Sequence, residues 1–310
     1  MSITDSVYAV VVTFNRVDLL KRTLKFLEAQ TKPLDKIIIV NNASTDATHG
    51  FLKEYCTSDL YAVYHLGENL GGAGGFSYGM RQAVIDTPDW IWIMDDDAFA
   101  APDCLFKLLT ANTKAEVRIP IQIDDTGRRY GLYADNGGLR EQAIQASGLQ
   151  KACSFTFVGP LFSRRLVEKI GLPRADFFIG ADDLEYAARI RGKGFEVVAI
   201  IDATISHMYG QGPQPFSRWG RKSLRTPIPA WKAYYSTRNG LAVDLIYSSG
   251  FEKFILAIRH VVKSVRAMPG EIFYEPEGFK KAKYRIMGLI DGILGRFGKR
   301  VIPNRILSRK

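Results

Sequence analysis

The sequence of 310 residues has few of the features that mark secreted, membrane-spanning or common nucleotide-binding proteins. It contains only three cysteines, without metal-like spacing, which predicts a reducing cytosol and no disulfide framework. No stretch approaches the roughly 18 apolar residues of a membrane span, and no N-terminal signal peptide is visible. The sequence also lacks the G-x-G-x-x-G pattern and the Gly-Lys-Ser/Thr of a P-loop. It therefore supports neither a nicotinamide-type dinucleotide site nor an NTPase.

The composition instead indicates a folded protein with two regions of opposite charge. Hydrophobic residues make up 46% of the chain and charged residues 24%, which is enough to bury a core. Residues 211–310 hold 20 Lys and Arg against 6 Asp and Glu, whereas residues 1–210 hold 22 against 26. The change falls near the loop-like Gly210-Gln211-Gly212-Pro213. We therefore predict a catalytic or binding domain over residues 1–210, followed by a basic, mainly helical region over residues 211–310.

Short apolar strands alternate with helical patterns through the first part of the chain. The expected strands cover residues 7–13, 36–40, 62–66 and the tryptophan-rich run from Trp90. This alternation predicts an α/β fold with a mostly parallel sheet and helices on both faces. Ligands of such sheets bind beyond the carboxyl ends of the strands. The polar residues that follow these strands should therefore meet on one rim, and they are Thr13, Asn41, Asn42, Asp95, Asp96 and Asp97.

The pattern is less regular further along the chain. Residues 117–157 read as a hairpin-like excursion with turns at 124–127 and 136–138. The later elements are expected to be a strand over 155–162, a helix over 164–170, a helix to about 191 and a strand over 195–201. Near the N-terminus, Thr13 or Asn15 is expected to cap the helix that follows the first strand.

The strand from Trp90 ends in three adjacent carboxylates, Asp95, Asp96 and Asp97. Three neighbouring negative charges are tolerated best when a cation lies among them. Because side chains alternate along an extended chain, Asp95 and Asp97 should point one way and Asp96 the other. Such a pair of hard oxygen ligands suits Mg²⁺ or Mn²⁺. An acidic loop without a metal is the alternative interpretation.

A glycine-rich stretch, Asn69-Leu70-Gly71-Gly72-Ala73-Gly74-Gly75-Phe76, opens another predicted helix. It is either a helix N-terminus with a flexible entry, or a place where backbone N–H groups approach a phosphate or a sugar. A second acidic pair, Asp182 and Asp183, also begins a helix after an apolar run. Acidic residues at that position suit the helix dipole, or one of them acts as a general base. His207, taken alone, is more typical of a packed or solvated histidine than of a metal ligand.

Taken in order, these motifs resemble a known family of enzymes. The order is Thr-x-Asn-Arg from Thr13, Val-Asn-Asn-x-Ser-x-Asp from Val40, the glycine-rich stretch, Asp-Asp-Asp, Asp-Asp-x-Glu-Tyr from Asp182 and a Ser-His-Met. Over residues 7 to about 240, it resembles the inverting family 2 glycosyltransferases, which have the Rossmann-like GT-A fold. Within that family the sequence is most similar to the bacterial galactofuranosyltransferases, and next to the rhamnosyltransferases.

The resemblance implies a role for each matching position. It makes Asp183 the catalytic base, with Asp182 as its neighbour. It implies a Mn²⁺ or Mg²⁺ site formed by Asp95, Asp97 and His207. The positions it implies for contact with the nucleotide sugar are Thr13, Asn15, Arg16, Asn42, Asp46, Asn69, Gly71, Gly72, Asp95 and Asp96.

Two further positions enter through the same resemblance. Asn41 stands where the family more usually has an aspartate, which leaves the contact with the base open at that position. The segment Tyr234-Tyr235-x-x-Arg238-Asn239 is similar to a stretch that follows the catalytic domain in many relatives. We expect this segment to position the acceptor or the domain.

The activity implied by the resemblance is metal-dependent, inverting transfer of galactofuranose from UDP-galactofuranose. The expected acceptor is a saccharide or a polyprenyl-diphosphate-linked saccharide, in the assembly of a cell-surface polysaccharide such as an O-antigen. One alternative is a rhamnosyltransferase that uses dTDP-rhamnose. The other is a non-catalytic membrane scaffold that binds nucleotide sugars.

The basic region contains two amphipathic segments, one from Phe251 to Met268 and one over residues 279–302. Apolar residues recur at helical spacing in both, with Lys and Arg around them. The pattern indicates helices that lie on a membrane surface, or helices that pack on the catalytic domain with their charged face in water. We expect a cytoplasmic protein peripherally associated with the inner face of the cell membrane. We expect no nucleic-acid partner, because no recognition motif accompanies the charge.

Overall fold

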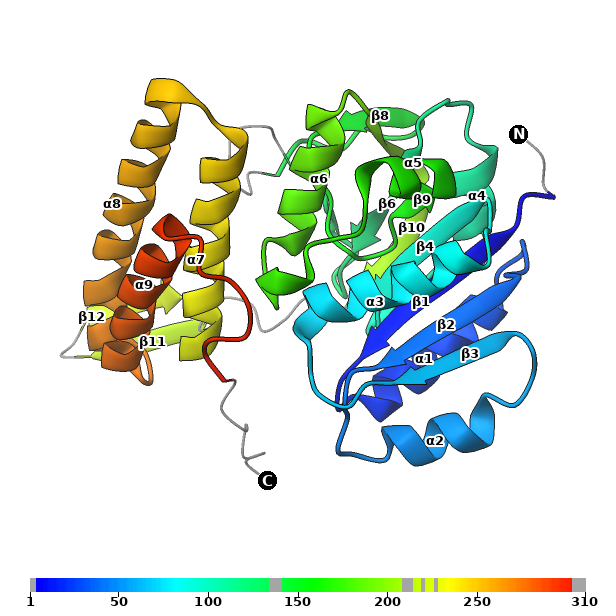
Figure 1. Cartoon of the computed structure of the whole chain (residues 1–310), viewed down its shortest axis with the longest axis horizontal. Helices are drawn as coiled ribbons and strands as arrows, with labels where there is room; N and C mark the ends of the chain where they lie inside the picture. The colour runs from blue at the N-terminus through cyan, green and yellow to red at the C-terminus, as the bar shows by residue number, and fades with distance from the viewer. Residues whose placement is uncertain (1–3, 134–140, 208–213, 219–220, 226–227, 303–310) are drawn as a thin grey trace. The chain divides into compact units, whose positions relative to one another are not determined.

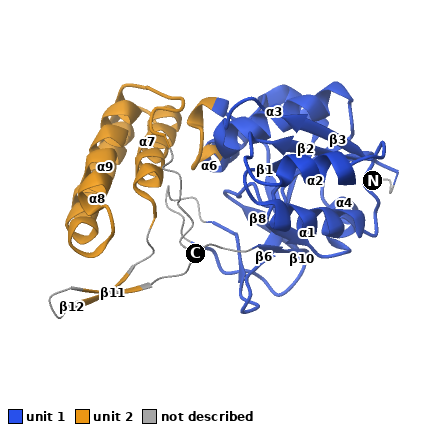
Figure 2. Ribbon diagram, turned by 90° about the horizontal axis from the view of Figure 1, so that it is seen from below, with its two compact units in different colours: residues 1–175, 183–208 blue, residues 176–182, 209–310 orange. Residues whose placement is uncertain are grey.

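The computed structural model describes residues 4–133, 141–207, 214–218, 221–225 and 228–302. It consists of two compact units (Figure 2). The first unit contains Met1–Ala175 and Asp183–Met208, and the second contains Asp176–Asp182 and Tyr209–Lys310. The second unit thus includes a short segment from the middle of the chain, which the charge pattern does not indicate. The linker expected at residues 210–213 lies outside the described residues, as does the turn expected at 136–138.

The first unit is built on one sheet with the strand order β3-β2-β1-β4-β9-β6-β10-β5 (Figure 1). Four neighbouring strands are parallel, and they are β3 (Tyr61–His65), β2 (Lys36–Asn41), β1 (Val7–Thr13) and β4 (Trp90–Asp95). This half of the sheet confirms the α/β prediction. Its strands begin and end close to the expected positions, because each is an apolar run bounded by polar residues.

The other half of the sheet is mixed. Strands β6 (Val117–Ile123) and β10 (Val197–His207) are parallel to each other. The short strands pair with β4, β6 or β10 in the antiparallel sense, and they are β5 (Ala98–Ala100), β7 (Arg129–Tyr130), β8 (Leu149–Ala152) and β9 (Leu161–Ser163). Short connections such as the turn between β6 and β7 cannot make the crossover that a parallel pair needs.

Helices cover both faces of this sheet. One face carries α1 (Val17–Glu28), α2 (Thr48–Tyr55) and α4 (Cys104–Thr110). The other carries α3 (Gly71–Ile85), α5 (Arg164–Ile170) and α6 (Asp182–Gly192). Alternate residues of β1 serve the two cores, with Ala9 and Val11 in one and Val10 and Val12 in the other. Burial on both faces explains why the strand is apolar throughout.

Helix α3 packs very close to β1 because two of its residues lack a side chain. A Cβ atom on Gly79 would lie 2.4 Å from Cγ1 of Val10, and one on Gly75 would lie 2.5 Å from Cγ1 of Val12. A Cβ atom on Gly72, in contrast, would meet nothing within 4 Å. Close helix–strand packing is therefore a third reason for the glycine-rich stretch, besides the two that the sequence suggested.

Two local predictions are wrong. The strand expected over residues 155–162 is restricted to β9, because Phe155 and Phe157 join a cluster of aromatic rings instead. The ring centroids of Phe155 and Phe162 lie 5.5 Å apart, and those of Phe76 and Phe157 lie 5.0 Å apart. Such edge-on pairs bury the rings in the core without requiring a strand.

The cap of α1 also differs from the prediction. Neither Thr13 nor Asn15 caps the helix, since its N-cap residue is Arg16 and makes no side-chain cap hydrogen bond. The carboxylate of Asp46 accepts a hydrogen bond from the backbone N–H of Val17 at 3.2 Å instead. A distant residue thus satisfies one of the free donors at this helix end.

The described residues of the second unit include the helices α7 (Ala230–Tyr247), α8 (Gly250–Tyr274) and α9 (Gly278–Ile293), and a hairpin of β11 (Gln214–Arg218) and β12 (Arg221–Arg225). Helix α9 approaches α7 closely at Gly288, where a Cβ atom would lie 2.7 Å from the carbonyl oxygen of Tyr234. Charged groups between the helices are paired, because the guanidinium of Arg285 binds both oxygens of Glu271. The prediction of a mainly helical basic region is confirmed. Within the described residues, no helix is both long and apolar enough to cross a membrane.

Candidate active site

The polar ends of three parallel strands lie side by side at one edge of the sheet. Thr13 at the end of β1 is in register with Asn41 at the end of β2, and Val12 is in register with Asp95 at the end of β4. The carboxyl edge of the parallel half therefore carries a rim of hydroxyl, amide and carboxylate groups. This is the edge at which ligands bind in open α/β sheets.

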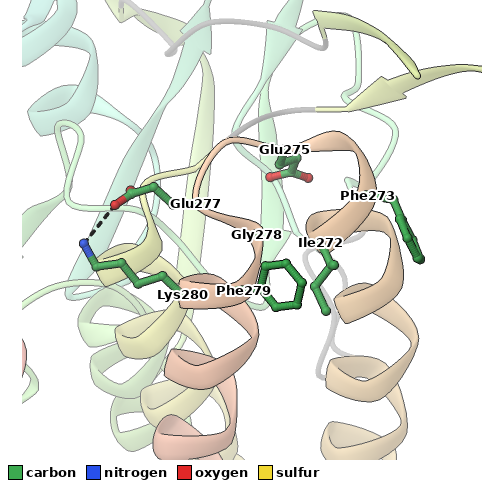
Figure 3. A pocket seen from close by; sticks show the side chains of 7 residues that line it. All are labelled: Ile272, Phe273, Glu275, Glu277, Gly278, Phe279 and Lys280. Carbon is green, nitrogen blue, oxygen red and sulfur yellow. Dashed lines mark hydrogen bonds and ion pairs between the residues drawn. The ribbon is translucent and has the colours of Figure 1, made fainter. Parts of the chain in front are cut away.

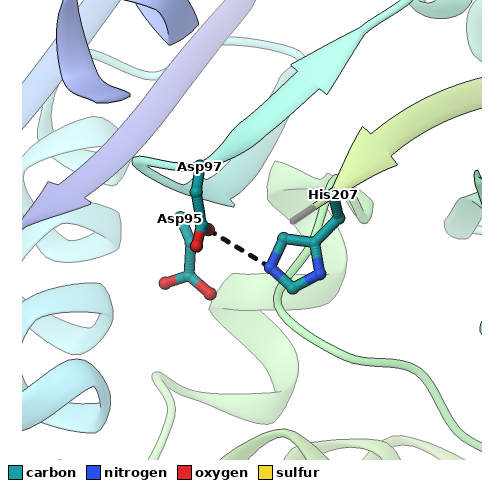
Figure 4. Close-up of side chains that lie close together, drawn as sticks. All are labelled: Asp95, Asp97 and His207. Atoms are coloured by element: carbon teal, nitrogen blue, oxygen red, sulfur yellow. Dashed lines mark ion pairs between the residues drawn. The ribbon is translucent and has the colours of Figure 1, made fainter. Parts of the chain in front are cut away.

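Two aspartates and a histidine come together beside this rim (Figure 4). One ligand atom each from Asp95, Asp97 and His207 lies within 4.8 Å of the other two. Asp95 ends β4 and His207 ends β10, where it pairs with Ala98 of β5, the residue after Asp97. A nitrogen of the imidazole, Nε2, lies 3.2 Å from Oδ1 of Asp97. Two segments far apart in the sequence thus supply the two ends of one cluster.

The third carboxylate, Asp96, faces other partners. The hydroxyl of Thr13 donates a hydrogen bond to Oδ2 of Asp96 at 2.7 Å, and that of Thr23 donates to its carbonyl oxygen. The guanidinium of Arg16 lies 3.3 Å from Oδ1 of Asp96 and 2.8 Å from Oδ2 of Asp97. Arg16 is half exposed, so it supplies positive charge to the acidic run while keeping one side open to solvent.

The titration of the cluster reflects its crowded negative charge. Burial, together with the charges of Asp97 and Asp96, raises the pKa of Asp95 to about 8. Burial also raises the pKa of Asp96 to about 6, although Arg16 and the Thr13 hydroxyl oppose the shift. For Asp97, burial acts upward, but His207 and Arg16 together outweigh it and lower the pKa. The chain's own cations therefore do not balance the carboxylates fully.

The residues of the cluster fit a divalent metal ion. Carboxylate oxygens and an imidazole nitrogen are ligands that Mn²⁺ accepts. Oδ1 of Asp97 is buried and is not satisfied by a hydrogen bond within the described residues, although Nε2 of His207 lies 3.2 Å away. A buried acceptor without a donor is costly unless a cation completes it. Asp95, Asp97 and His207 are thus a suitable set of ligands for Mn²⁺ or Mg²⁺.

Tyr130 is a residue of this site that the sequence did not indicate. Its hydroxyl lies 3.5 Å from Nδ1 of His207 and donates a hydrogen bond to the carbonyl oxygen of His207 at 3.3 Å. A partner on Nδ1 orients the ring so that Nε2 faces Asp97. The signal is absent from the sequence because Tyr130 lies in β7, a strand of two residues with no periodicity to detect.

Two predicted donor-binding asparagines hold the start of α3. The side-chain amide of Asn42 donates to the carbonyl oxygen of Gly71 at 2.9 Å, and its oxygen accepts from the N–H of Leu70 at 2.8 Å. The oxygen of Asn69 accepts from the N–H of Gly71 at 2.7 Å. Gly71 has a φ of +74°, which glycine adopts without strain. These contacts shape the backbone that is predicted to approach the donor. A Cβ atom on Gly72, in the same segment, would meet nothing within 4 Å, so this stretch of backbone is accessible.

Three other predicted residues shape the neighbouring loops. The side-chain oxygen of Asn15 accepts from the N–H of Thr45 at 2.6 Å, and the carboxylate of Asp46 accepts from the N–H groups of Val17 and Thr48. Both polar groups of Asn41 are engaged within the chain, its oxygen by the N–H of Ser44 and its amide by Nδ1 of His65. An aspartate at position 41 would have no hydrogen-bond donor, whereas the side-chain amide of Asn41 contacts His65 through its nitrogen.

The predicted base and its neighbour begin helix α6. Asp182 is buried, and Asp183 is partly exposed. An oxygen of Asp183 accepts a hydrogen bond from the N–H of Leu184 at 2.7 Å. Burial raises the pKa of Asp183 to about 6, although that backbone hydrogen bond acts in the opposite direction. Asp182 and Asp183 are not members of the Asp95–Asp97–His207 cluster. A carboxylate with a pKa near neutrality is well suited to accept a proton.

A pocket of about 490 Å³ lies elsewhere, at the turn between α8 and α9 (Figure 3). Two of its acidic residues are paired with lysines, Glu275 with Lys281 and Glu277 with Lys280. The exposed rings of Phe273 and Phe279 give the rest of its lining an apolar character. Nothing in this pocket resembles the acidic and imidazole chemistry of the rim.

Comparison with known proteins agrees with the fold and the site. The family described as "Glycosyl transferase family 2" matches residues 8–171, which include the rim and the acidic run. The chain belongs to this family, and it is a glycosyltransferase.

Its relatives transfer more than one sugar. The chain is 32% identical over 248 residues to galactofuranosyltransferase GlfT1 of Mycobacterium tuberculosis. The aligned region covers 76% of this chain and 81% of the relative. The chain is 25% identical over 303 residues to the dTDP-rhamnosyl transferase RfbF of Shigella flexneri, which covers 95% of this chain and 97% of the relative.

Solved structures with this fold share little sequence with the chain. GalNAc-T7 with UDP, GalNAc and Mn²⁺ matches with a TM-score of 0.64 and 15% identity, covering 94% of this chain and 56% of that chain. The mannosyltransferase PcManGT from Pyrobaculum calidifontis, in complex with GDP-Man and Mn²⁺, matches with a TM-score of 0.55 and 14% identity. The match covers 95% of this chain and 89% of that chain. Both are glycosyltransferases of the GT-A fold, and that fold is confirmed for this chain.

Proposed function

We propose that the protein transfers galactofuranose from UDP-galactofuranose, with inversion, to a saccharide or a polyprenyl-diphosphate-linked saccharide. The observation that carries the proposal is the meeting of Asp95, Asp97 and His207 at the rim of the sheet in a family 2 chain. The similarity to a galactofuranosyltransferase over most of both chains supports this choice of sugar. Such an enzyme serves the assembly of a cell-surface polysaccharide.

Asp95, Asp97 and His207 would hold a Mn²⁺ or Mg²⁺ ion. When bound, such an ion neutralises the charge that develops on the leaving nucleoside diphosphate. Two solved neighbours of the same fold are described with Mn²⁺ and a nucleotide or nucleotide sugar, which supports the assignment. Tyr130 would keep His207 oriented toward the cluster.

The chain's own groups supply the remaining steps. Thr13, Arg16 and Asn42 lie at or beside the rim and would line the donor site with hydroxyl, guanidinium and amide groups. Asp183 would accept the proton of the acceptor hydroxyl as that oxygen attacks the anomeric carbon. A single base, with no covalent enzyme intermediate, fits displacement in one step and therefore inversion.

The donor sugar is tested by turnover with two nucleotide sugars. We expect release of nucleoside diphosphate from UDP-galactofuranose to exceed release from dTDP-rhamnose under the same conditions. Equal or faster turnover of dTDP-rhamnose would favour the rhamnosyltransferase alternative, which the similarity to RfbF supports. Binding of either donor without any turnover would favour the non-catalytic scaffold.

We also propose that the second unit binds the inner face of the cell membrane from the cytoplasmic side. Helix α8 carries apolar side chains at i, i+3 and i+4 spacing that remain exposed: Phe251, Phe254, Ile255, Ile258, Val261, Val262 and Val265. Basic residues lie along the same helix: Lys253, Arg259, Lys263 and Arg266. Its buried positions, such as Ser264 and Glu271, are polar. The apolar stripe of α8 therefore faces away from its own helical unit.

The stripe on α8 fits an anionic lipid surface. An apolar helix face flanked by Lys and Arg binds at the headgroup boundary through both burial and charge. Helix α9 adds exposed apolar residues, including Phe279, Ile286 and Ile290, and the last turn of α8 adds Phe273 (Figure 3). A lipid-linked acceptor would be found at the same surface.

Point substitutions test this surface better than truncation. Removing the C-terminal residues would also remove Val301, whose carbonyl oxygen accepts a hydrogen bond from the buried hydroxyl of Tyr235. We expect the double variant Phe251→Ser, Phe254→Ser to lose at least about tenfold in binding to anionic vesicles, given roughly 1.5–3 kcal/mol for full burial of one large apolar side chain. Ile85→Ser is a matched control, because Ile85 is 66% exposed on α3 in the first unit. Unchanged vesicle binding by the double variant would contradict the proposed surface.

A further inference from the structure

The segment that leads into the proposed base has a strained backbone. Three of its residues adopt left-handed conformations, Phe178 with φ +65°, Gly180 with φ +78° and Ala181 with φ +58°. Phe178 and Ala181 are not glycines, so they adopt this region at a cost that surrounding contacts must offset. Asp182 and Asp183 follow directly in the chain. Whatever holds this turn also determines how the chain enters α6.

Asn239 of α7 holds the turn through several hydrogen bonds from its side-chain amide. Its side-chain amide donates to the carbonyl oxygens of Phe177 at 2.9 Å, Ile179 at 3.0 Å and Gly180 at 2.7 Å. Asn239 is fully buried. Phe177 ends a short 3₁₀ helix, Ala175–Phe177, and its carbonyl oxygen also accepts from the N–H of Ile179. The carbonyl groups of Ile179 and Gly180 lie in the turn that follows, where the side chain of Asn239 satisfies them.

Arg238 completes the same network. Its guanidinium donates to the carbonyl oxygen of Phe177 at 2.9 Å and to that of Gly298 at 2.8 Å, and its Nε donates to the side-chain oxygen of Asn239 at 2.8 Å. Its charge lies over the rings of Tyr235 and Phe297. Arg238 is fully buried as well. A buried cation is expensive unless it is bonded on all sides, and here it is bonded to the backbone around the turn.

We propose that Arg238 and Asn239 are positioning residues for the catalytic base, a role that rests on the proposed function of Asp183. The network fixes the turn from which the chain continues directly into Asp182 and Asp183. An apolar pair would have been enough to pack α7. A buried arginine and asparagine that donate to the carbonyl groups of Phe177, Ile179 and Gly180 instead specify one conformation of this turn.

The experiment compares three single variants with the full-length wild type. Asn239→Ala removes the hydrogen bonds of the side-chain amide, and Gly180→Ala disfavours the left-handed conformation without a clash, because a Cβ there meets nothing within 4 Å. Gly194→Ala is the matched control. Gly194 has φ +82° and equally open surroundings, but it lies in the turn after α6. The measurements are steady-state kinetics with UDP-galactofuranose, melting temperature and amide hydrogen exchange over residues 177–184.

We expect Asn239→Ala and Gly180→Ala to lower kcat by roughly 10- to 100-fold, the scale of a misplaced catalytic group. The KM for the donor should stay within about twofold, because the donor site is on other elements. Exchange over residues 177–184 should become faster in these two variants only. Gly194→Ala should lose comparable stability but keep its kcat.

Two results would overturn the proposal. An equal loss of kcat in Gly194→Ala would mean that general destabilisation explains the effect. Unchanged exchange over residues 177–184 in a folded Asn239→Ala protein would mean that Asn239 does not hold the turn. If the wild type turns over no nucleotide sugar, the proposed function fails separately, and the exchange result still decides whether the network holds the turn.

Discussion

The close packing of α3 on β1 makes Gly79 a position where one added methyl group should be costly. A Cβ atom there would lie 2.4 Å from Cγ1 of Val10 and 3.0 Å from Cγ2 of Val40, whereas carbon atoms in contact are normally about 3.5–4.0 Å apart. Both valines belong to strands that are buried on both faces, so neither can move aside without disturbing the sheet.

The magnitude follows from two opposing effects. Overpacking a well-packed core costs about 1–3 kcal/mol, and replacing glycine by alanine inside a helix returns about 0.5–1 kcal/mol. Because a contact of 2.4 Å places this substitution in the upper part of the overpacking range, the net destabilisation of Gly79→Ala should be about 1–2 kcal/mol. For a unit of this size, that corresponds to a fall in Tm of roughly 2–8 °C, which thermal unfolding followed by circular dichroism can measure.

Gly72→Ala is the matched control in the same helix. A Cβ at Gly72 meets nothing within 4 Å, so the Tm should stay the same or rise slightly. The KM for the donor should rise, because this open backbone is where the donor is proposed to approach. A Gly79→Ala protein as stable as the wild type would refute the packing argument. A Gly72→Ala protein with an unchanged donor KM would refute the role of Gly72.

Three further predictions concern the chemistry of the site. Asp183→Asn should lower turnover by roughly 10²-fold or more with donor binding nearly intact, and Asp182→Asn should matter less; the reverse order in turnover assays would exchange the two roles. Because burial raises the pKa of Asp183 to about 6, and the base works deprotonated, kcat/KM should rise with pH through this value and level off above it. A pH profile of kcat/KM that is flat from pH 5 to 7 would contradict this role. Tyr130→Phe removes the hydroxyl that contacts His207, so about 10- to 100-fold more Mn²⁺ should be needed for half-maximal activation, and an unchanged Mn²⁺ titration would exclude the orienting role.

The parallel half of the fold could be predicted from the sequence because its signals are local. The strand over residues 7–13 has the expected bounds, since an unbroken β-branched run ends at a polar residue. Strand β5 was not predicted because three residues carry too little periodicity. Helix α5 was predicted and α4 was not, although each has seven residues, because α5 begins at the capping residue Ser163 and ends at Gly171, whereas α4 has no side-chain cap. The aromatic cluster around Phe157 overrode the local strand preference, and no local pattern reveals such a tertiary effect.

Some residues of the candidate site could be predicted from the sequence, and others could not. The sequence indicated Asp95, Asp97 and His207 through the order of its motifs, and the structure brings these three side chains together. It did not indicate Tyr130, whose contact with His207 arises from the pairing of β7 with β6. Nor did it indicate that Asn239 would hold the turn before Asp183, since hydrogen bonds across 60 residues leave no periodic trace.

The most direct test of the central claim is the metal dependence of sugar transfer by the purified full-length protein. Release of UDP from UDP-galactofuranose should stop in excess EDTA and return when Mn²⁺ or Mg²⁺ is added in excess of the chelator. Asp97→Asn, which removes one ligand oxygen, should remain nearly inactive even after the metal is restored. Full activity of the wild type in excess EDTA would contradict the metal site.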